Sequence, residues 1–303
     1  MSRKGLIMHQ KDLAEKLLFD YNDVFADVIN GYVFKGIQRI DENQLKEGKI
    51  RSQFKADDRM LHEQERDILK EWCDSNIRIA ICGIENQTIP DEYMPLRVIS
   101  YDGASYKSQL IEKTKKVVPV ITVVLYFGTE KRWEFPRNLK NILDIPPEMD
   151  DFVNDYRINV LEVAWMDEIE LNHFNSDFKI VANFLINRRK NPGYIPDDPT
   201  VIQHYDEILK LLSIITKDEK YEEIIGMPSE DNKEEKSMCT VAQNLINIGR
   251  NEGRIEGRNE GWIEGRNEEK KNAIEHLAEF FARKNPELTP EQAREMATTA
   301  LKY

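Results

Sequence analysis

Cysteine and histidine are scarce in this chain, and neither is arranged as a set of metal ligands. The three cysteines, Cys73, Cys82 and Cys239, have no metal-type spacing and no even pairing. We therefore expect free thiols in a reducing, cytoplasmic environment. The five histidines are scattered along the chain. The sequence excludes a Cys/His metal centre on these grounds.

The chain also has no long apolar run, and it has fewer positive than negative charges. No segment approaches the ~20 apolar residues that cross a bilayer, and no signal peptide is recognised, so we expect a soluble protein without a membrane partner. Lys and Arg number 43 against 55 Asp and Glu, a net charge of −12. This balance counts against a protein that coats nucleic acid, because non-specific binding depends on neutralising phosphates.

What the chain does contain is a predicted hairpin that carries three polar side chains. Residues 65–88, ERDILKEWCDSNIRIAICGIENQT, read as two strands joined at CDSN. Side chains alternate faces along a strand, so Glu85 and Gln87 share a face. If the chain reverses near residues 75–76, Asp67 lies across from Glu85, within one or two residues of register.

Two opposed acids on a hairpin can share a cation. Directly opposed residues have Cβ atoms roughly 5 Å apart, and carboxylate oxygens with waters are the ligands that Mg²⁺ prefers. Such a cation activates water against a phosphodiester. The alternative is a solvated hairpin face that carries ordinary acids.

Four segments of the chain, taken in order, carry a family resemblance. They are NDVFADVIN (22–30), ERDILKEW (65–72), the segment 83–110 that begins GIENQTIPDEYMPLR, and VITVVLYFGTEKRWEFPRNL (120–139). They resemble the Rpn family of recombination-promoting nucleases, which includes proteins described as transposases, within the PD-(D/E)XK nuclease superfamily. The resemblance covers roughly residues 15–220.

The resemblance implies an α/β fold, with a PD-(D/E)XK nuclease-like mixed central sheet flanked by helices. It implies a DNA endonuclease that uses Mg²⁺ or Mn²⁺, with Asp67 and Glu85 as metal ligands and Gln87 as a third catalytic residue. Gln87 stands where the superfamily usually has Lys, although Gln is common in the Rpn pattern. Because Gln donates hydrogen bonds but carries no charge, we expect slower turnover and unimpaired metal binding.

A helix is predicted beyond the hairpin, and it carries the expected substrate-binding residues. Arg97, Tyr101, Tyr106 and Gln109 match the family's M-x-x-R-x-x-x-Y-x-x-x-x-Y-x-x-Q run. A guanidinium on such a helix can hold a phosphate in bidentate fashion, so we expect Arg97, Tyr101 and Lys107 to bind DNA. The alternative is that Arg97 pairs with a structural carboxylate such as Asp102 or Glu85.

Other charged residues surround this predicted site. Asp27, on a helix predicted over 11–30, is interpreted as a solvated acid, with water-mediated metal binding as the alternative. Asp57 and Asp58 are runner-up ligands. Residues 105–140 hold a basic strip that suits a nuclease cleft, or else a solvated helix face with a charged loop. Its bases are Lys107, Lys113, Lys115, Lys116, Lys131, Arg132, Arg137 and Lys140, against Glu112, Glu130 and Glu134.

The remaining patterns predict the organisation of the chain. Strands are expected at 32–40, at the β-branched run 117–127 in the sheet centre, and at 154–166 as another inner strand. Helices are expected at 174–187 and 201–216. We divide the chain into a nuclease-like domain (1–192), a packing-helix region (193–227), an acidic linker (228–237) and a helical extension (238–303).

The extension opens with a tetrapeptide repeat of Gly, Glu and Arg. Gly recurs every fourth residue from Gly249 to Gly265, and Glu from Glu252 to Glu268. Each Gly costs a helix about 1 kcal/mol relative to Ala, so we expect close packing against a partner, in a coiled-coil-like homo-oligomer. The alternative is a flexible linker. A helical hairpin follows, with LTPEQ as its capped start.

Two functions follow from these patterns. The first is a metal-dependent DNA endonuclease that promotes recombination. The alternative is a catalytically silent nuclease fold that binds DNA or protein and oligomerises through its C-terminal repeat.

Overall fold

The computed structural model describes residues 17–48, 51–55, 61–65, 67–75, 77–112, 116–225, 227 and 236–301. Asp57, Asp58, Lys113 and Lys115 lie outside these residues. The chain divides into two compact units, residues 1–243 and 244–303. Among the described residues, no helix is long and apolar enough to span a membrane.

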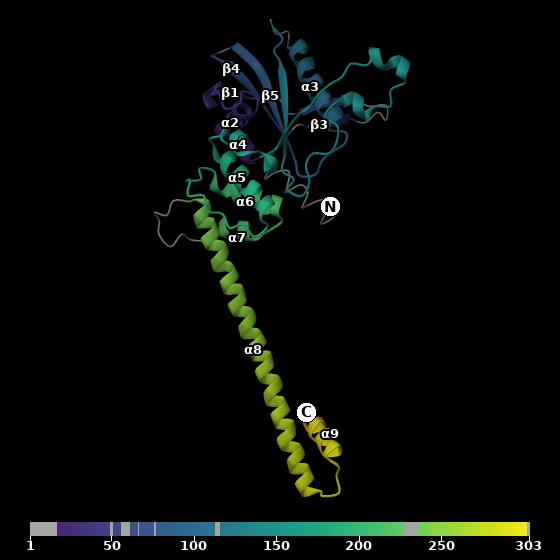
Figure 1. Ribbon diagram of the computed structural model, residues 1–303, viewed down its shortest axis with the longest axis vertical. Helices are drawn as coiled ribbons and strands as arrows, with labels where there is room; N and C mark the ends of the chain where they lie inside the picture. Colours follow the sequence, from purple (N-terminus) through teal and green to yellow (C-terminus); the bar gives the residue numbers. More distant parts are fainter. Residues whose placement is uncertain are drawn as a thin grey trace. The chain divides into compact units, whose positions relative to one another are not determined.

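The larger unit mixes strands and helices (Figure 1). Its strands are β1 (Leu45–Glu47), β2 (Arg51–Lys55), β3 (Leu61–Glu65), β4 (Ile68–Asp74), β5 (Ile77–Gln87), β6 (Val120–Tyr126) and β7 (Asn159–Glu162). Its helices are α2 (Asn22–Tyr32), α3 (Met94–Ile111), α4 (Glu168–Leu171), α5 (Asp177–Lys190), α6 (Tyr205–Thr216) and α7 (Lys220–Ile225). Short 3₁₀ turns lie at Glu42–Gln44, Leu139–Ile142, Pro147–Phe152 and Val163–Trp165.

The central sheet has the order β1-β4-β5-β6-β7. β4 is antiparallel to both β1 and β5, whereas β5, β6 and β7 run parallel. A separate two-stranded sheet joins β2 and β3. The sheet is therefore mixed, and the α/β expectation is confirmed. β6 lies between two parallel neighbours with Val123, Val124 and Leu125 fully buried, as its β-branched run predicted.

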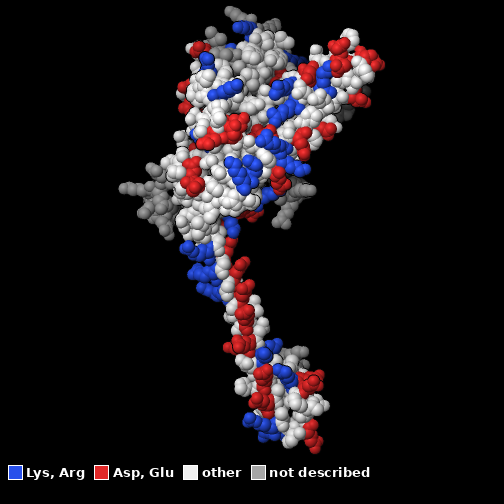
Figure 2. Space-filling model, viewed as in Figure 1, with Lys and Arg blue, Asp and Glu red and all other residues white. Residues whose placement is uncertain are grey.

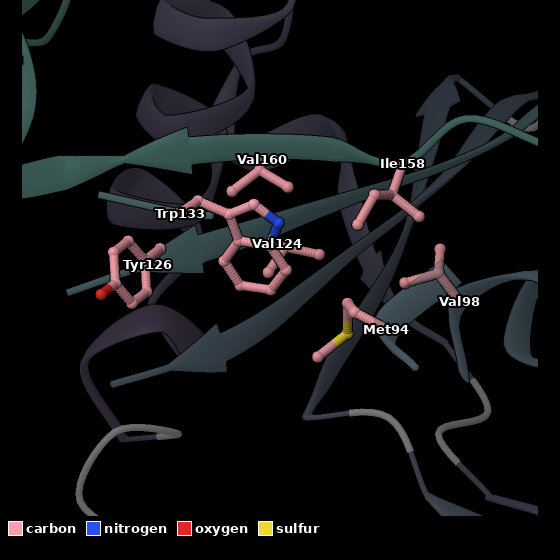
Figure 3. Close-up of a cluster of buried hydrophobic side chains, with 7 residues drawn as sticks. All are labelled: Met94, Val98, Val124, Tyr126, Trp133, Ile158 and Val160. Carbon is pink, nitrogen blue, oxygen red and sulfur yellow. The ribbon is translucent and has the colours of Figure 1, made fainter. Parts of the chain in front are cut away.

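Helices cover both faces of this sheet. α3 connects β5 to β6 and packs on one face through a buried cluster (Figure 3), whose members are Met94, Val98, Val124, Tyr126, Trp133, Ile158 and Val160. On the other face, Phe19 contacts Phe127 and the α5 residue Phe178. The Tyr32 hydroxyl of α2 donates to the β7 carbonyl of Val160. Glu85 shares the α3 face, because its register partner is Val124.

The expected strand at 32–40 is wrong. The chain turns there through Lys35 and Gly36, both at positive φ. The buried Asn30 amide then bonds the backbone of Arg39 and Ile40, so these groups need no strand partner. On the side of β4 away from β5, the neighbouring strand is β1, which the sequence patterns did not predict.

The strand expected at 154–166 is present as β7, but the expected inner position is wrong. Only Asn159–Glu162 joins the ladder, and β7 is the last strand in the described sheet. It is nevertheless buried at Val160 and Leu161. An isolated bridge between Asn138 and Arg157 brings the preceding loop over this edge.

The smaller unit is helical. α8 (Met238–Lys284) begins in the larger unit and runs for 47 residues through the whole repeat, so the helical interpretation of the repeat is confirmed. α9 (Pro290–Ala300) starts with a Thr289 capping box and Pro at its first turn, as LTPEQ predicted. Arg294 of α9 pairs with Glu275 of α8 at 2.9 Å.

Candidate metal and substrate site

The predicted hairpin is formed by β4 and β5. The chain reverses through Ser75, where φ is 57°, and Ile68 pairs with Ile84. Continuing this antiparallel ladder by one residue sets Asp67 opposite Glu85. The Asp67 carboxylate also accepts a hydrogen bond of 2.8 Å from the backbone N–H of Asn86. The expected register is thus confirmed, and the Asn86 contact adds an anchor that spacing alone could not reveal.

Glu85 is 1% exposed, and its carboxylate pairs with the Arg97 guanidinium of α3. Burying a carboxylate is costly unless a partner offsets its charge. Burial alone would lower the Arg97 pKa, but Glu85, Tyr101 and Asp91 outweigh it and the Arg97 pKa is raised. The structure shows the pairing with Glu85 that was the alternative interpretation of Arg97; Asp102 lies elsewhere.

Asp91 is a member of this cluster that the sequence analysis missed. One of its oxygens accepts from Arg97 at 3.0 Å, and the other accepts from the Tyr93 N–H at 2.9 Å, just before α3 begins. Asp91 therefore fixes both the start of α3 and the orientation of the Arg97 guanidinium group. The signal was an acid six residues before Arg97, at a helix start.

Three further predicted residues have different surroundings. Tyr101 is half-buried beside Arg97, and burial followed by the charge of Glu85 raises its pKa. Gln87 is half-buried at the end of β5 and follows Glu85 on the same face. Lys107 is exposed on α3, ten residues from Arg97, or about 15 Å along the axis. Lys107 is thus not part of the Asp67–Glu85 cluster.

The family run along α3 separates into two ends. Arg97 and Tyr101 face the acids. The Tyr106 hydroxyl accepts from the Val120 N–H at 3.1 Å, and the Gln109 amide bonds both backbone groups of Val118, at 2.8 and 3.1 Å. The second half of the run therefore anchors α3 to the start of β6.

Asp102 and Asp27 are structural acids. Asp102 accepts from Thr122 of β6 at 2.6 Å and from the Tyr156 hydroxyl. Asp27 is 5% exposed and accepts from Asn175 and Ser176, at the start of α5. The interpretation of Asp27 as a solvated acid is wrong, because α5 needs a buried acceptor at its N-terminus. Burial raises the Asp27 pKa, and the Ser176 and Asn175 hydrogen bonds oppose that rise.

Much of the predicted basic strip is paired internally. Lys131 pairs with Glu134 at 3.8 Å, Arg137 with Glu162 at 2.8 Å and Lys140 with Asp150 at 2.7 Å. Lys107 and Lys116 are exposed. Figure 2 shows Lys and Arg in several patches on the visible face of the larger unit, interspersed with Asp and Glu.

The donor set at the hairpin fits a hard divalent cation. Asp67 and Glu85 offer carboxylate oxygens on one face, and Gln87 offers an amide oxygen. Mg²⁺ commonly keeps several waters and takes only one or two protein carboxylates together with substrate phosphate. Among the described residues no group of three or more His, Cys, Asp or Glu could hold a metal, and Asp67 and Glu85 are the two carboxylates that oppose each other on this hairpin.

The mixed sheet, the β5–α3–β6 crossover and the opposed acids define an α/β protein of nuclease-like fold. Residues 74–220 match the family model described as "Putative transposase, YhgA-like". Over these residues the chain is similar to that family, and the sequence resemblance is confirmed there. The match includes Glu85, Gln87 and Arg97 and begins after Asp67. No curated protein and no solved structure matches the chain significantly.

Proposed function

We propose that the protein is a DNA endonuclease that requires Mg²⁺ or Mn²⁺, hydrolyses phosphodiester bonds and thereby promotes recombination in the cytoplasm. The observation that carries the proposal is the opposition of Asp67 and Glu85 across the β4–β5 hairpin, with Arg97 on the same carboxylate. The family description indicates transposase-type chemistry on DNA.

Asp67 and Glu85 would hold the cation, which when bound supplies a Lewis acid that activates water. The Asn86 N–H orients Asp67, and β5 fixes the face on which Glu85 stands. Gln87, on the same face, donates a hydrogen bond to the attacking water or to a phosphate oxygen. Arg97 and Tyr101 approach from α3 and bind the phosphate, while Lys107 contacts DNA further along the helix.

The rival proposal is a catalytically silent protein of the same fold that binds DNA or protein. Two observations favour it. Gln87 supplies no positive charge to the pentacovalent phosphate, and Arg97 already engages Glu85.

We also propose that α8 pairs with α8 of a second copy, in a coiled-coil-like arrangement. Figure 2 shows basic and acidic residues on different sides of α8, so the Arg side of one copy complements the Glu side of another. Ile255 and Trp262 are 57% and 62% exposed and lie seven residues apart, on one line along the helix. In the described chain nothing lies within 4 Å of a Cβ added at any repeat glycine from Gly249 to Gly265, which leaves room for a neighbouring helix.

Cleavage of supercoiled plasmid in Mg²⁺ and in Mn²⁺ tests the nuclease proposal. We expect Asp67→Asn and Glu85→Gln to lower the rate by about 10²-fold or more. We expect Gln87→Lys to raise it, because it adds the missing charge. Glu92→Gln is the matched control, since Glu92 is an exposed acid in the same loop as Asp91.

Melting temperatures of all variants separate lost chemistry from lost folding. Equal plasmid cleavage rates for wild type, Asp67→Asn and Glu85→Gln would refute the nuclease proposal. A wild type that binds DNA in both metals and never cuts it would establish the silent alternative.

A further inference from the structure

Two guanidinium groups lie close to the ring of one half-buried tryptophan, Trp165. The guanidinium carbon of Arg189 is 4.2 Å from the Trp165 ring centroid, and that of Arg132 is 5.2 Å from it. The Trp165 indole N–H donates to the Gly128 carbonyl at 2.9 Å, just after β6. Arg189 Nε donates to the Ala164 carbonyl at 2.8 Å. The ring and one guanidinium are thus fixed by backbone contacts.

These two arginines differ from their basic neighbours. Arg137 and Lys131 are each engaged by a carboxylate. Across the described part of the chain, neither Arg132 nor Arg189 forms an ion pair. Stacking on an indole holds a guanidinium in place and leaves its in-plane N–H groups available. A planar fork of this kind matches the oxygens of a phosphate.

A cavity of about 260 Å³ adjoins the stacked groups, and Arg132, Arg137 and Trp165 line it. Two carboxylates, Glu162 and Glu170, also line it. Their oxygens already accept from the chain. Glu162 accepts from the Trp133 N–H and from Arg137, both at 2.8 Å, and Glu170 accepts from the Asp167 N–H at 3.0 Å. Of the two stacked arginines, Arg132 lines the cavity, and Arg189 lies against the ring of Trp165, which also lines it.

The sheet places Glu162, which lines this cavity, two strands away from Gln87. Gln87 is the register partner of Tyr126, and Tyr126 is the register partner of Glu162. These three residues end the parallel strands β5, β6 and β7 at one edge. Adjacent strands lie about 4.8 Å apart, so β7 is roughly 10 Å from β5. Trp165 follows Glu162 by three residues. A chain of regularly spaced phosphates can reach both places.

We propose that Arg132 and Arg189, held by Trp165, form a binding site for a backbone phosphate of duplex DNA away from the bond that is cut. The assignment rests on the proposed DNA substrate and is independent of cleavage. A duplex carries one charge per about 1.7 Å of its axis, so a phosphate lies opposite this cluster when another lies at Glu85. The bound phosphate fixes the direction of the strand across the carboxyl edge of the sheet.

The test is the anisotropy of a labelled DNA duplex, titrated with Arg132→Gln and Arg189→Gln protein in EDTA over a series of KCl concentrations. We expect each variant to bind about tenfold more weakly, with a salt slope that is smaller by about one. Arg188→Gln is the matched control. It removes the same charge one residue away, from a guanidinium that stacks on Phe184 and not on Trp165. Trp165→Leu should act like the two arginine variants.

Losses no larger than that of Arg188→Gln, or an unchanged salt slope, would overturn the site. A plasmid assay separates this result from the nuclease question. If the arginine variants bind more weakly and the wild type never cuts, the phosphate site stands and the nuclease proposal is refuted. If the arginine variants bind DNA normally and the wild type cuts it, the phosphate site is refuted and the nuclease proposal stands. A third outcome is that the cluster binds inorganic phosphate while the variants keep the duplex affinity of the wild type. That result would make the cluster a site for a free anion and contradict the DNA assignment.

Discussion

Arg97 occupies the place beside Glu85 where a cation is needed. Glu85 is almost completely buried, and its charge requires an opposite charge nearby. In the absence of metal, Arg97 supplies that charge while its other nitrogen holds Asp91. A divalent cation on Glu85 would repel the guanidinium. Arg97 would then keep Asp91 and become available to a phosphate.

This competition predicts that Arg97→Gln binds Mn²⁺ more tightly in the absence of DNA, by about tenfold, a typical coupling between two charged ligands of one group. Calorimetry with Mn²⁺ measures the affinity, and Glu85→Gln should abolish the heat. The same Arg97 variant should bind duplex DNA more weakly. Weaker Mn²⁺ binding by Arg97→Gln would contradict the competition and make Arg97 a residue that prepares Glu85 for the metal.

α8 depends on an interaction between chains for part of its stability. Its repeat glycines lower helix propensity, and Ile255 and Trp262 are two of its apolar residues that face solvent. Burial of each against a second copy would contribute about 1.5–3 kcal/mol.

We therefore expect the double variant Ile255→Glu, Trp262→Glu to be monomeric where the wild type has the mass of two or more chains. Light scattering after size-exclusion chromatography measures this mass. Ile169→Glu serves as the control, because Ile169 is 74% exposed on α4 in the larger unit. A wild type with the mass of one chain, or a double variant with an unchanged mass, would rule out pairing through α8.

The elements differ in how far the sequence predicted them. The β4–β5 hairpin, β6, α3 and α8 were predictable because their signals are local: alternation, a β-branched run and a helical period. β1 was missed and 32–40 was mistaken for a strand, because the deciding contacts join distant residues. Asn30 bonds a turn ten residues away, and Leu45 pairs with Trp72.

The candidate site was predictable only in part for the same reason. Asp67, Glu85 and Gln87 lie on one hairpin, so strand geometry brings them together. The partnership of Arg97 with Glu85 and Asp91 requires the angle at which α3 returns over the sheet. The cluster of Arg132, Trp165 and Arg189 joins three separate segments, and no spacing in the sequence indicates it.

The larger unit as a whole should be sensitive to alkaline pH through Tyr221. Tyr221 is 2% exposed, and burial raises its pKa to about 12. An unfolded chain releases this proton near pH 10. The folded state retains it longer, so the stabilising contribution is complete below about pH 10 and is lost as the pH rises to about 12.

We expect Tyr221→Phe to gain about 2–3 kcal/mol relative to wild type over that interval. Urea unfolding at pH 8 and at a series of higher values measures the difference, with Tyr93→Phe as the control, because Tyr93 is 56% exposed. A constant difference between Tyr221→Phe and wild type at every pH would contradict a buried, late-titrating phenol.

The two ends of α3 have different roles, and this predicts which of its residues related proteins keep. Tyr106 and Gln109 hold the helix on β6, so any relative that keeps the architecture must keep such anchors. Arg97 and Tyr101 lie at the acids and, in the proposed function, bind the phosphate, so a lineage that no longer cuts DNA is free to replace them. A relative that keeps both halves of the run is therefore expected to be an enzyme. A relative that keeps only Tyr106 and Gln109 is expected to keep the fold without the activity.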